Sequence, residues 1–167
     1  MDKKIDMYTP EELAKYLLTF INYENGDRFY EPFKGNGAFY NNMPEPKDWA
    51  EITQGRDFFI YRPFNDGKCE HIVTNPPFTI DINGMEENGF ILTLEHSMDI
   101  ATKTIAYLVN HKFLNSLTPQ RLNKYYKNGW SITNIMVLSI SKWYGRYWYL
   151  IFSKDSESLI KWNIRNW

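Results

Sequence analysis

Cysteine is almost absent from this 167-residue chain: the single Cys69 excludes an internal disulfide and any metal site built from several thiolates. The three histidines have no metal-ligand spacing, so we expect no metal. No stretch approaches the roughly 20 apolar residues of a transmembrane helix, and the first ten residues lack the apolar segment of a secretory signal. We therefore expect a protein of the cytoplasm or of another intracellular compartment.

Acidic residues are scarce in the second part of the chain. Residues 101–167 contain 2 Asp and Glu against 10 Lys and Arg, whereas residues 1–100 contain 18 acidic and 9 basic residues. This asymmetry predicts a polyanionic partner for the second part, although the two halves of a dipolar protein could instead attract each other. The predicted nucleic-acid contacts are basic residues of this part: Lys103, Lys112, Arg121, Lys124, Lys127, Lys142 and Arg146.

No repeat, low-complexity tract or flexible linker interrupts the sequence, so we expect one domain over residues 1–167. Apolar periodicity, a Thr9 capping box and turn residues predict helices at 11–22, 90–101 and 119–128. The same signals predict strands at 28–31, 49–52, 57–60, 71–74, 104–109, 134–140 and 146–152. Strands that alternate with helices indicate an α/β protein with parallel strands.

A glycine-rich turn follows the strand predicted at 28–31. Glu31 ends that strand, and Gly35 and Gly37 follow it. Glycines let a backbone approach a ligand closely, and a carboxylate can hold a ribose hydroxyl or an ammonium group. Without Gly-Lys-Ser/Thr the turn is no phosphate-binding P-loop, and Tyr40 replaces the third glycine of the dinucleotide fingerprint. A tight connection that binds nothing remains an alternative.

The segment Asn75-Pro76-Pro77-Phe78 is more specific, and it follows the strand predicted at 71–74. Each proline fixes its own φ and pushes the preceding residue towards an extended conformation. The segment therefore presents the Asn75 side-chain oxygen and the Pro76 carbonyl as fixed acceptors beside the Phe78 ring. Two acceptors aimed at one point suit a planar NH₂ group, which has two hydrogens to donate. A proline-stiffened strand exit without function is the alternative.

Together these motifs resemble a known family. The order of a Thr-Pro helix start, a Glu-Pro-Phe-x-Gly-x-Gly turn and Asn-Pro-Pro-Phe is similar to that of S-adenosylmethionine-dependent amino-methyltransferases, above all the N6-adenine DNA methyltransferases. The resemblance covers residues 8–152. It implies a Rossmann-like, doubly wound, mostly parallel seven-stranded sheet with an antiparallel C-terminal strand, and S-adenosylmethionine as the cofactor.

The resemblance also assigns site residues. The catalytic loop would consist of Asn75, Pro76, Pro77 and Phe78. The implied cofactor site comprises Tyr8, Thr9, Pro10, Glu31, Pro32, Phe33, Gly35, Gly37, Glu51, Asp57, Phe58 and Asn75. In this assignment Glu51 binds the ribose hydroxyls, and Asp57 and Phe58 lie beside the adenine of the cofactor. Two departures are that Glu31 stands where many relatives have aspartate and that the spacing from Glu51 to Asp57 is short.

The implied function is methyl transfer to the exocyclic amino group of adenine in nucleic acid, with DNA expected more than RNA. Alternatives are the same fold acting on adenine or guanine of RNA or on protein glutamine, and a non-catalytic nucleic-acid-binding subunit. The chain has no room for a separate target-recognition domain. Specificity is therefore loose, or a partner chain supplies it, or the substrate is single-stranded or RNA. We expect residues 79–89 to form a mobile lid over the target base.

Overall fold

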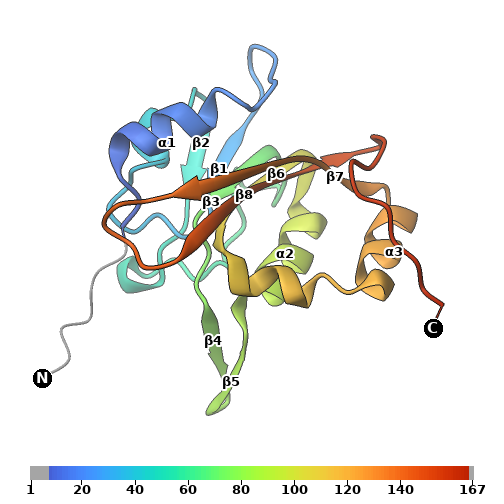
Figure 1. Cartoon of the computed structure of the whole chain (residues 1–167). Coiled ribbons are helices and arrows are strands. Elements are labelled where there is room, and N and C mark those ends of the chain that lie inside the picture. Colours follow the sequence, from blue (N-terminus) through green and yellow to red (C-terminus); the bar gives the residue numbers. More distant parts are fainter. Residues whose placement is uncertain (1–7, 166–167) are drawn as a thin grey trace, which may run out of the picture.

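A six-stranded sheet forms the centre of the molecule, and the computed structural model describes residues 8–165 (Figure 1). The order of the strands across the sheet is β2-β1-β3-β6-β8-β7. Their bounds are β1 Phe29–Glu31, β2 Lys47–Trp49, β3 Cys69–Thr74, β6 Ala101–Asn110, β7 Trp130–Ser139 and β8 Arg146–Lys154.

Five of the six strands run in the same direction. β2, β1, β3 and β6 pair in parallel, and β8 lies antiparallel between β6 and β7. The mostly parallel α/β fold with an antiparallel C-terminal strand is therefore confirmed. Because the parallel strands end at one edge, the segments that follow β1, β2 and β3 meet there, where open α/β sheets bind ligands.

The described residues form six strands in this sheet, one fewer than predicted. The strand predicted at 57–60 is wrong, because that segment is a turn: the Asp57 carboxylate accepts a hydrogen bond from the Phe59 N–H at 2.9 Å, and the Asp57 carbonyl accepts one from Tyr61 at 2.7 Å. An aspartate that bonds backbone two residues on competes with strand pairing. The segment between β2 and β3 thus consists of turns and one short 3₁₀ helix, η2 (Ile52–Gln54).

Helices cover both faces of the sheet (Figure 1). α1 (Glu11–Leu18) packs on one face, and α2 (Gly89–Ile100) and α3 (Pro119–Lys127) pack on the other. Short 3₁₀ helices are η1 (Tyr40–Asn42) and η3 (His111–Ser116). The predicted capping box is wrong: Pro10 occupies the N-cap position without a side-chain bond, and the helix ends at Leu18 instead of Asn22.

Alternating residues of β6 explain the two layers. Ile105 and Tyr107 face the core under α2 and α3, whereas Ala106 and Leu108 face the core under α1. All four are fully buried, as expected for a central strand with both faces covered. The Tyr107 hydroxyl lies 2.6 Å from that of Ser97 on α2, which fastens this helix to the sheet.

Residues 79–88 form a β-hairpin that projects from the body of the molecule (Figure 1), so the predicted loop is wrong in its structure. β4 (Thr79–Ile82) pairs antiparallel with β5 (Met85–Asn88). Asn83 and Gly84 connect them with φ values of 55° and 82°, the left-handed pair that a two-residue hairpin turn favours. Within residues 8–165, no helix is both long and apolar enough to cross a membrane.

Candidate functional site

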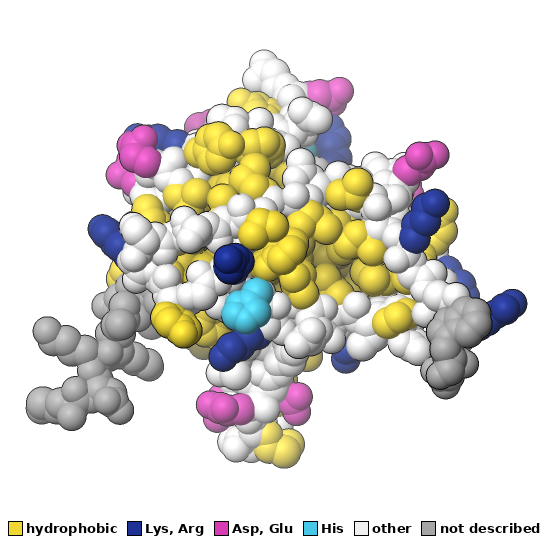
Figure 2. Space-filling model, in the orientation of Figure 1, with side chains coloured by type: hydrophobic (Ala, Val, Ile, Leu, Met, Phe, Trp, Pro, Cys, Tyr) yellow, Lys and Arg dark blue, Asp and Glu magenta, His cyan; other side chains and the backbone are white. Residues whose placement is uncertain are grey.

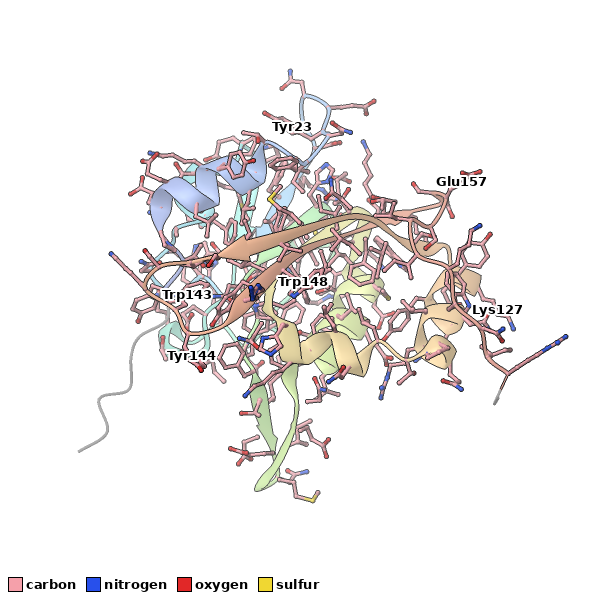
Figure 3. All side chains as sticks on the ribbon, in the orientation of Figure 1. Tyr23, Lys127, Trp143, Tyr144, Trp148 and Glu157 are labelled. Carbon is pink, nitrogen blue, oxygen red and sulfur yellow. The ribbon has the colours of Figure 1, made fainter. Side chains whose placement is uncertain are left out.

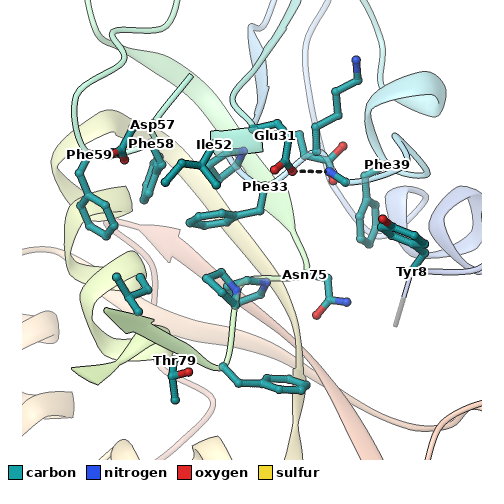
Figure 4. Close-up of a pocket in the computed structure, with 18 of the residues that line it drawn as sticks. Tyr8, Glu31, Phe33, Phe39, Ile52, Asp57, Phe58, Phe59, Asn75 and Thr79 are labelled. Carbon is teal, nitrogen blue, oxygen red and sulfur yellow. Dashed lines mark hydrogen bonds between the residues drawn. The ribbon is translucent and has the colours of Figure 1, made fainter. Parts of the chain in front are cut away.

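A cavity of about 840 Å³ opens at the carboxyl edge of the sheet, between the segments that follow β1, β2 and β3 (Figure 4). This volume lies within the usual range of small-molecule sites. All four residues of the predicted catalytic loop line it. So do ten of the twelve predicted cofactor residues: Tyr8, Thr9, Glu31, Pro32, Phe33, Gly35, Glu51, Asp57, Phe58 and Asn75. Pro10 and Gly37 do not.

Glu31 is a buried acid at the inner wall of this cavity. Its side chain is 2% exposed, and its Oε2 accepts a hydrogen bond from the Tyr40 N–H at 2.6 Å. Burial raises the pKa of Glu31 well above its usual range, although this hydrogen bond and the charge of Lys34 act against the shift. In the described part of the chain Glu31 forms no ion pair, so its carboxyl is available to a cation in the cavity.

The glycine turn fits closely against its neighbours. Gly35 has a φ of 51°, and a β-carbon there would lie 3.3 Å from the Tyr8 ring. The Gly35 N–H donates to Glu51 Oε2 at 2.9 Å, while Glu51 Oε1 accepts a bond from the hydroxyl of Thr53 at the same distance. Glu51 therefore holds the glycine turn against the segment after β2 and also presents its carboxylate to the cavity.

An apolar wall lines one side of the cavity, to the left of Glu31 in Figure 4. Phe58 is 2% exposed and packs edge-on against Phe33, with 5.1 Å between ring centroids. Ile52 and Phe59 also line the cavity and are 70% and 39% exposed. The sequence prediction missed these two, although Ile52 directly follows Glu51 and Phe59 directly follows Phe58. Exposed apolar side chains in a cavity can cover a flat ring such as a purine.

The Asn-Pro-Pro-Phe loop forms the opposite wall. The Asn75 Nδ2 donates towards the Thr9 hydroxyl at 3.5 Å, the outer limit of a hydrogen bond, which leaves Asn75 Oδ1 open to the cavity. Thr9 was predicted as a cofactor residue, and the structure places it against the catalytic loop as well. The Phe78 ring is 41% exposed and rests on Phe113, with 5.4 Å between centroids.

Gly89, the first residue of α2, holds this loop from behind. Its N–H donates to the Phe78 carbonyl at 3.1 Å. A β-carbon at Gly89 would lie 2.5 Å from the Pro77 carbonyl oxygen, a distance that no real side chain tolerates. The sequence prediction missed this role, and its only signal is a glycine that opens a helix where helix-forming residues are preferred.

The seven predicted nucleic-acid contacts do not gather on one surface. Lys103 lies at the amino end of β6, Lys127 ends α3, and Lys124 pairs with Glu95 at 3.1 Å. Arg121 donates to the Ser116 carbonyl at 3.0 Å. The remaining three follow the carboxyl ends of β6 and β7, near the cavity, and are exposed: Lys112, Lys142 and Arg146.

Among the described residues, 8–165, no three side chains of His, Cys, Asp or Glu lie close enough together to bind one metal ion. His71 is buried beside Asp27 at the far edge of the sheet.

The sequence matches no protein-family model and no curated protein. Solved structures do share its fold. A modification subunit of a proposed type I restriction enzyme from Vibrio vulnificus has a TM-score of 0.67 at 13% identity, covering 90% of this chain and 45% of its own length. This chain thus spans less than half of that subunit.

Two further structures extend the comparison. A proposed RNA methyltransferase from Pyrococcus horikoshii has a TM-score of 0.61 at 14% identity, covering 87% of this chain and 86% of its own. TYW2 of M. jannaschii, solved with S-adenosylmethionine, has a TM-score of 0.51 at 14% identity, covering 89% and 77%. These structural matches establish a Rossmann-like fold that is shared with methyltransferases. At identities this low they do not identify the substrate.

Proposed function

We propose that this protein transfers a methyl group from S-adenosylmethionine to the exocyclic amino group of adenine in nucleic acid, DNA more readily than RNA. One observation carries the proposal: a single cavity contains an unpaired buried carboxyl, an apolar wall and a proline-locked pair of acceptors. The fold shared with methyltransferases of several substrates supports it.

The cavity residues fit the cofactor. S-adenosylmethionine supplies an electrophilic methyl group on a cationic sulfonium. Glu31 offers a buried carboxyl, which a cationic ligand would favour in its ionised form, to the positive end of the cofactor, and Glu51 offers an acceptor for ribose hydroxyls. Ile52 and Phe59 provide the exposed apolar surface that an adenine ring would cover.

Asn75 and Pro76 would orient the target amine. The lone pair of the adenine amino nitrogen is delocalised into the ring, so this nitrogen is a weak nucleophile. When Asn75 Oδ1 and the Pro76 carbonyl each accept one N–H bond, the lone pair can point at the methyl carbon. In-line positioning of this kind can lower a barrier by several kcal/mol, up to about 7–11 kcal/mol in model systems.

The proton leaves after the methyl group arrives. The nitrogen–carbon bond forms as the carbon–sulfur bond breaks, and the amine then loses its extra proton to water. Asn75 is neutral and takes no proton, so its role is to position and polarise. The exposed face of Phe78 would stack on the base, worth about 1–3 kcal/mol on the usual aromatic–base scale.

A second candidate is methylation of a protein glutamine, whose amide also presents NH₂ on a planar carbon. The observation that favours it is the acidic β4–β5 hairpin, which carries Asp81, Glu86 and Glu87 on exposed positions beside the cavity. Such a surface would attract a basic polypeptide segment. A partner chain that supplies specificity is compatible with either candidate, and so is methylation of RNA.

Labelled cofactor decides between these functions. The protein is incubated with methyl-labelled S-adenosylmethionine and, separately, single-stranded DNA, duplex DNA, RNA and a glutamine-containing basic protein. Products are hydrolysed and the modified residue is identified by mass spectrometry. Label on the N6 atom of adenine supports the proposal, and label on glutamine establishes the second candidate. Absence of any label, combined with no calorimetric binding of S-adenosylmethionine, would overturn both.

A further inference from the structure

The loop between β7 and β8 carries an aromatic side chain that does not pack against the rest of the protein. Tyr144 is 99% exposed, whereas the neighbouring Trp143 is 8% exposed and packs against Tyr147 with 4.6 Å between centroids. Trp143 thus anchors the loop while Tyr144 projects from it (Figure 3). Lys142 and Arg146 flank Tyr144, and both are exposed.

This loop lies next to the catalytic segment. Lys142 and Trp143 line a smaller hollow of about 350 Å³ together with Thr9, whose hydroxyl is 3.5 Å from Asn75 Nδ2.

The same loop also contacts η3. A β-carbon at Gly145 would lie 3.6 Å from the His111 ring. Lys112 follows His111 and is exposed, and Phe113 of the same helix supports the Phe78 ring. The loop and the first residues of η3 therefore form one continuous basic margin beside Asn75 and Phe78.

The β4–β5 hairpin next to this basic margin is acidic, and its Asn88 Nδ2 donates to the Ser116 hydroxyl of η3 at 2.6 Å. Between residues 69 and 102 the chain has no Lys or Arg, and the hairpin exposes Asp81, Glu86 and Glu87. Asp81 itself lines the cavity. Figure 2 shows acidic side chains on the projecting hairpin and basic side chains where it joins the body of the molecule. A chain of phosphates would be attracted to the basic margin and repelled by the hairpin beside it.

We propose that Lys112, Lys142, Tyr144 and Arg146 form a strand-binding surface for single-stranded nucleic acid; this inference rests on the proposed function. The three cations contact phosphates on one side of the target base, and Tyr144 stacks on a neighbouring base. The acidic hairpin disfavours the second strand of a duplex, because a bulkier duplex bound at the basic margin would bring more phosphates close to Asp81, Glu86 and Glu87. A single strand also avoids the few kcal/mol needed to extract a base from a duplex.

Equilibrium binding tests the stacking residue. Fluorescence anisotropy is measured with a labelled 12-nucleotide DNA containing one adenine and with the same DNA as a duplex, in the presence of S-adenosylhomocysteine to prevent turnover. We expect tighter binding of the single strand, and Tyr144→Ala to weaken it about 5- to 100-fold, the range expected for one stacked base. Tyr144→Phe keeps the ring and should bind like the original protein.

Tyr23→Ala is the matched control. Tyr23 is 51% exposed and lies at the other edge of the molecule from Tyr144 (Figure 3). Its replacement should leave both DNA affinities unchanged. A common melting temperature for all variants separates loss of the contact from loss of the fold.

Charge variants test the basic margin and the acidic hairpin. Lys142→Ala and Arg146→Ala should each lower the salt dependence of single-strand binding by about one ion, whereas Lys161→Ala, an exposed lysine near the C-terminus, should not. A combined Glu86→Gln and Glu87→Gln variant should bind the duplex more tightly and narrow the difference between duplex and single strand.

Equal or tighter binding of the duplex would overturn the inference, as would a folded Tyr144→Ala variant whose affinity stays within twofold. These results are independent of methyl transfer. Tyr144-dependent strand binding without any methylation would overturn the proposed reaction alone. Methylation that does not respond to Tyr144 would overturn the strand-binding surface alone.

Discussion

Charged side chains have opposite roles at the two ends of the parallel strands: the amino edge, where these strands begin, and the carboxyl edge, where they end. At the amino edge, Asp27 accepts a bond from Lys103 Nζ at 2.9 Å and lies 2.9 Å from His71 Nε2. Arg28 nearby pairs with Glu70 at 3.1 Å and with Asp66 at 2.7 Å. At the carboxyl edge, in the described chain, Glu31 and Arg146 have no ion-pair partner. Charges at one edge stabilise the fold, and those at the other remain available to ligands.

The contrast explains why a count of basic residues is a poor guide to a binding surface. Lys103 is the first basic residue of the stretch 100–154, which contains no Asp or Glu, yet its ammonium is held by Asp27 and Glu24. The positive charge of the second half thus partly attracts the negative first half, as a dipolar protein would. The following predictions test whether charged residues at the amino edge stabilise the fold while those at the carboxyl edge bind ligands.

Asn75→Ala should have the largest effect and act only at the carboxyl edge. Removing the fixed acceptor leaves the amine unoriented, so the methyl-transfer rate should fall on the order of 10²–10³-fold or more, as for other preorganised polar groups. Binding of S-adenosylmethionine, measured by calorimetry, should stay within about twofold, since the proposed hydrogen bond of Asn75 Oδ1 is to the target amine. Asn123→Ala on α3 is the control, and full activity of the Asn75 variant would reject its role.

Gly89→Ala should disturb the same edge indirectly. The new β-carbon displaces the Pro77 carbonyl, and a displacement near 1 Å can cost about 10²-fold in rate. We expect kcat to fall, and the melting temperature to fall as well, because the clash with backbone outweighs the better helix propensity of alanine. Asp99→Ala, at the far end of α2, should leave kcat unchanged. An unaffected kcat in the Gly89 variant would show that the loop tolerates the shift.

Asp27→Ala should show the opposite pattern at the amino edge. It leaves His71 and Lys103 without their shared acceptor, so urea unfolding should report a loss of about 1–3 kcal/mol, with kcat of the folded protein unchanged. Asp66 is 55% exposed, so Asp66→Ala should cost at most about 1 kcal/mol. A large fall in kcat for the Asp27 variant would contradict the proposal that the amino edge acts only on stability.

Lowering the pH should decrease the stability of the folded protein through His71 and Asp27 at the amino edge, an effect smaller than those above. Burial lowers the pKa of the His71 ring despite the neighbouring carboxylate. Burial opposes ionisation of Asp27, but the Glu24 N–H, Lys103 and His71 hold its pKa well below the usual value. Both groups therefore bind fewer protons when folded, and stability falls as the pH drops below the unfolded pKa of each.

The melting temperature should accordingly decrease from pH 7.5 to pH 5.5, where His71 is the titrating group. His71→Phe should flatten this dependence, because a phenyl ring at the buried position has no proton to bind. An equal slope in both proteins would contradict the assignment.

Local motifs made the site predictable, whereas long-range pairing did not. Glu31 and Asn75 were identified because Glu31 ends a strand, Asn75 directly follows one, and each is fixed by its own neighbours. The partners of Lys103 could not be read from the sequence, because Asp27 lies 76 residues away. The β4–β5 hairpin could have been predicted, since Asn83-Gly84 separates short apolar-containing segments. The apolar run at 57–60 indicated a strand, but Asp57 turned the chain instead.

Burial of Glu31 should couple cofactor uptake to the loss of a proton. Burial disfavours the ionised form of this carboxyl and raises its pKa, whereas a cationic ligand favours the ionised form. Binding should therefore release a proton, and affinity should rise with pH between the bound and free pKa values. Calorimetry in buffers of different ionisation enthalpy would detect the released proton as a buffer-dependent heat. Glu31→Gln should remove that dependence.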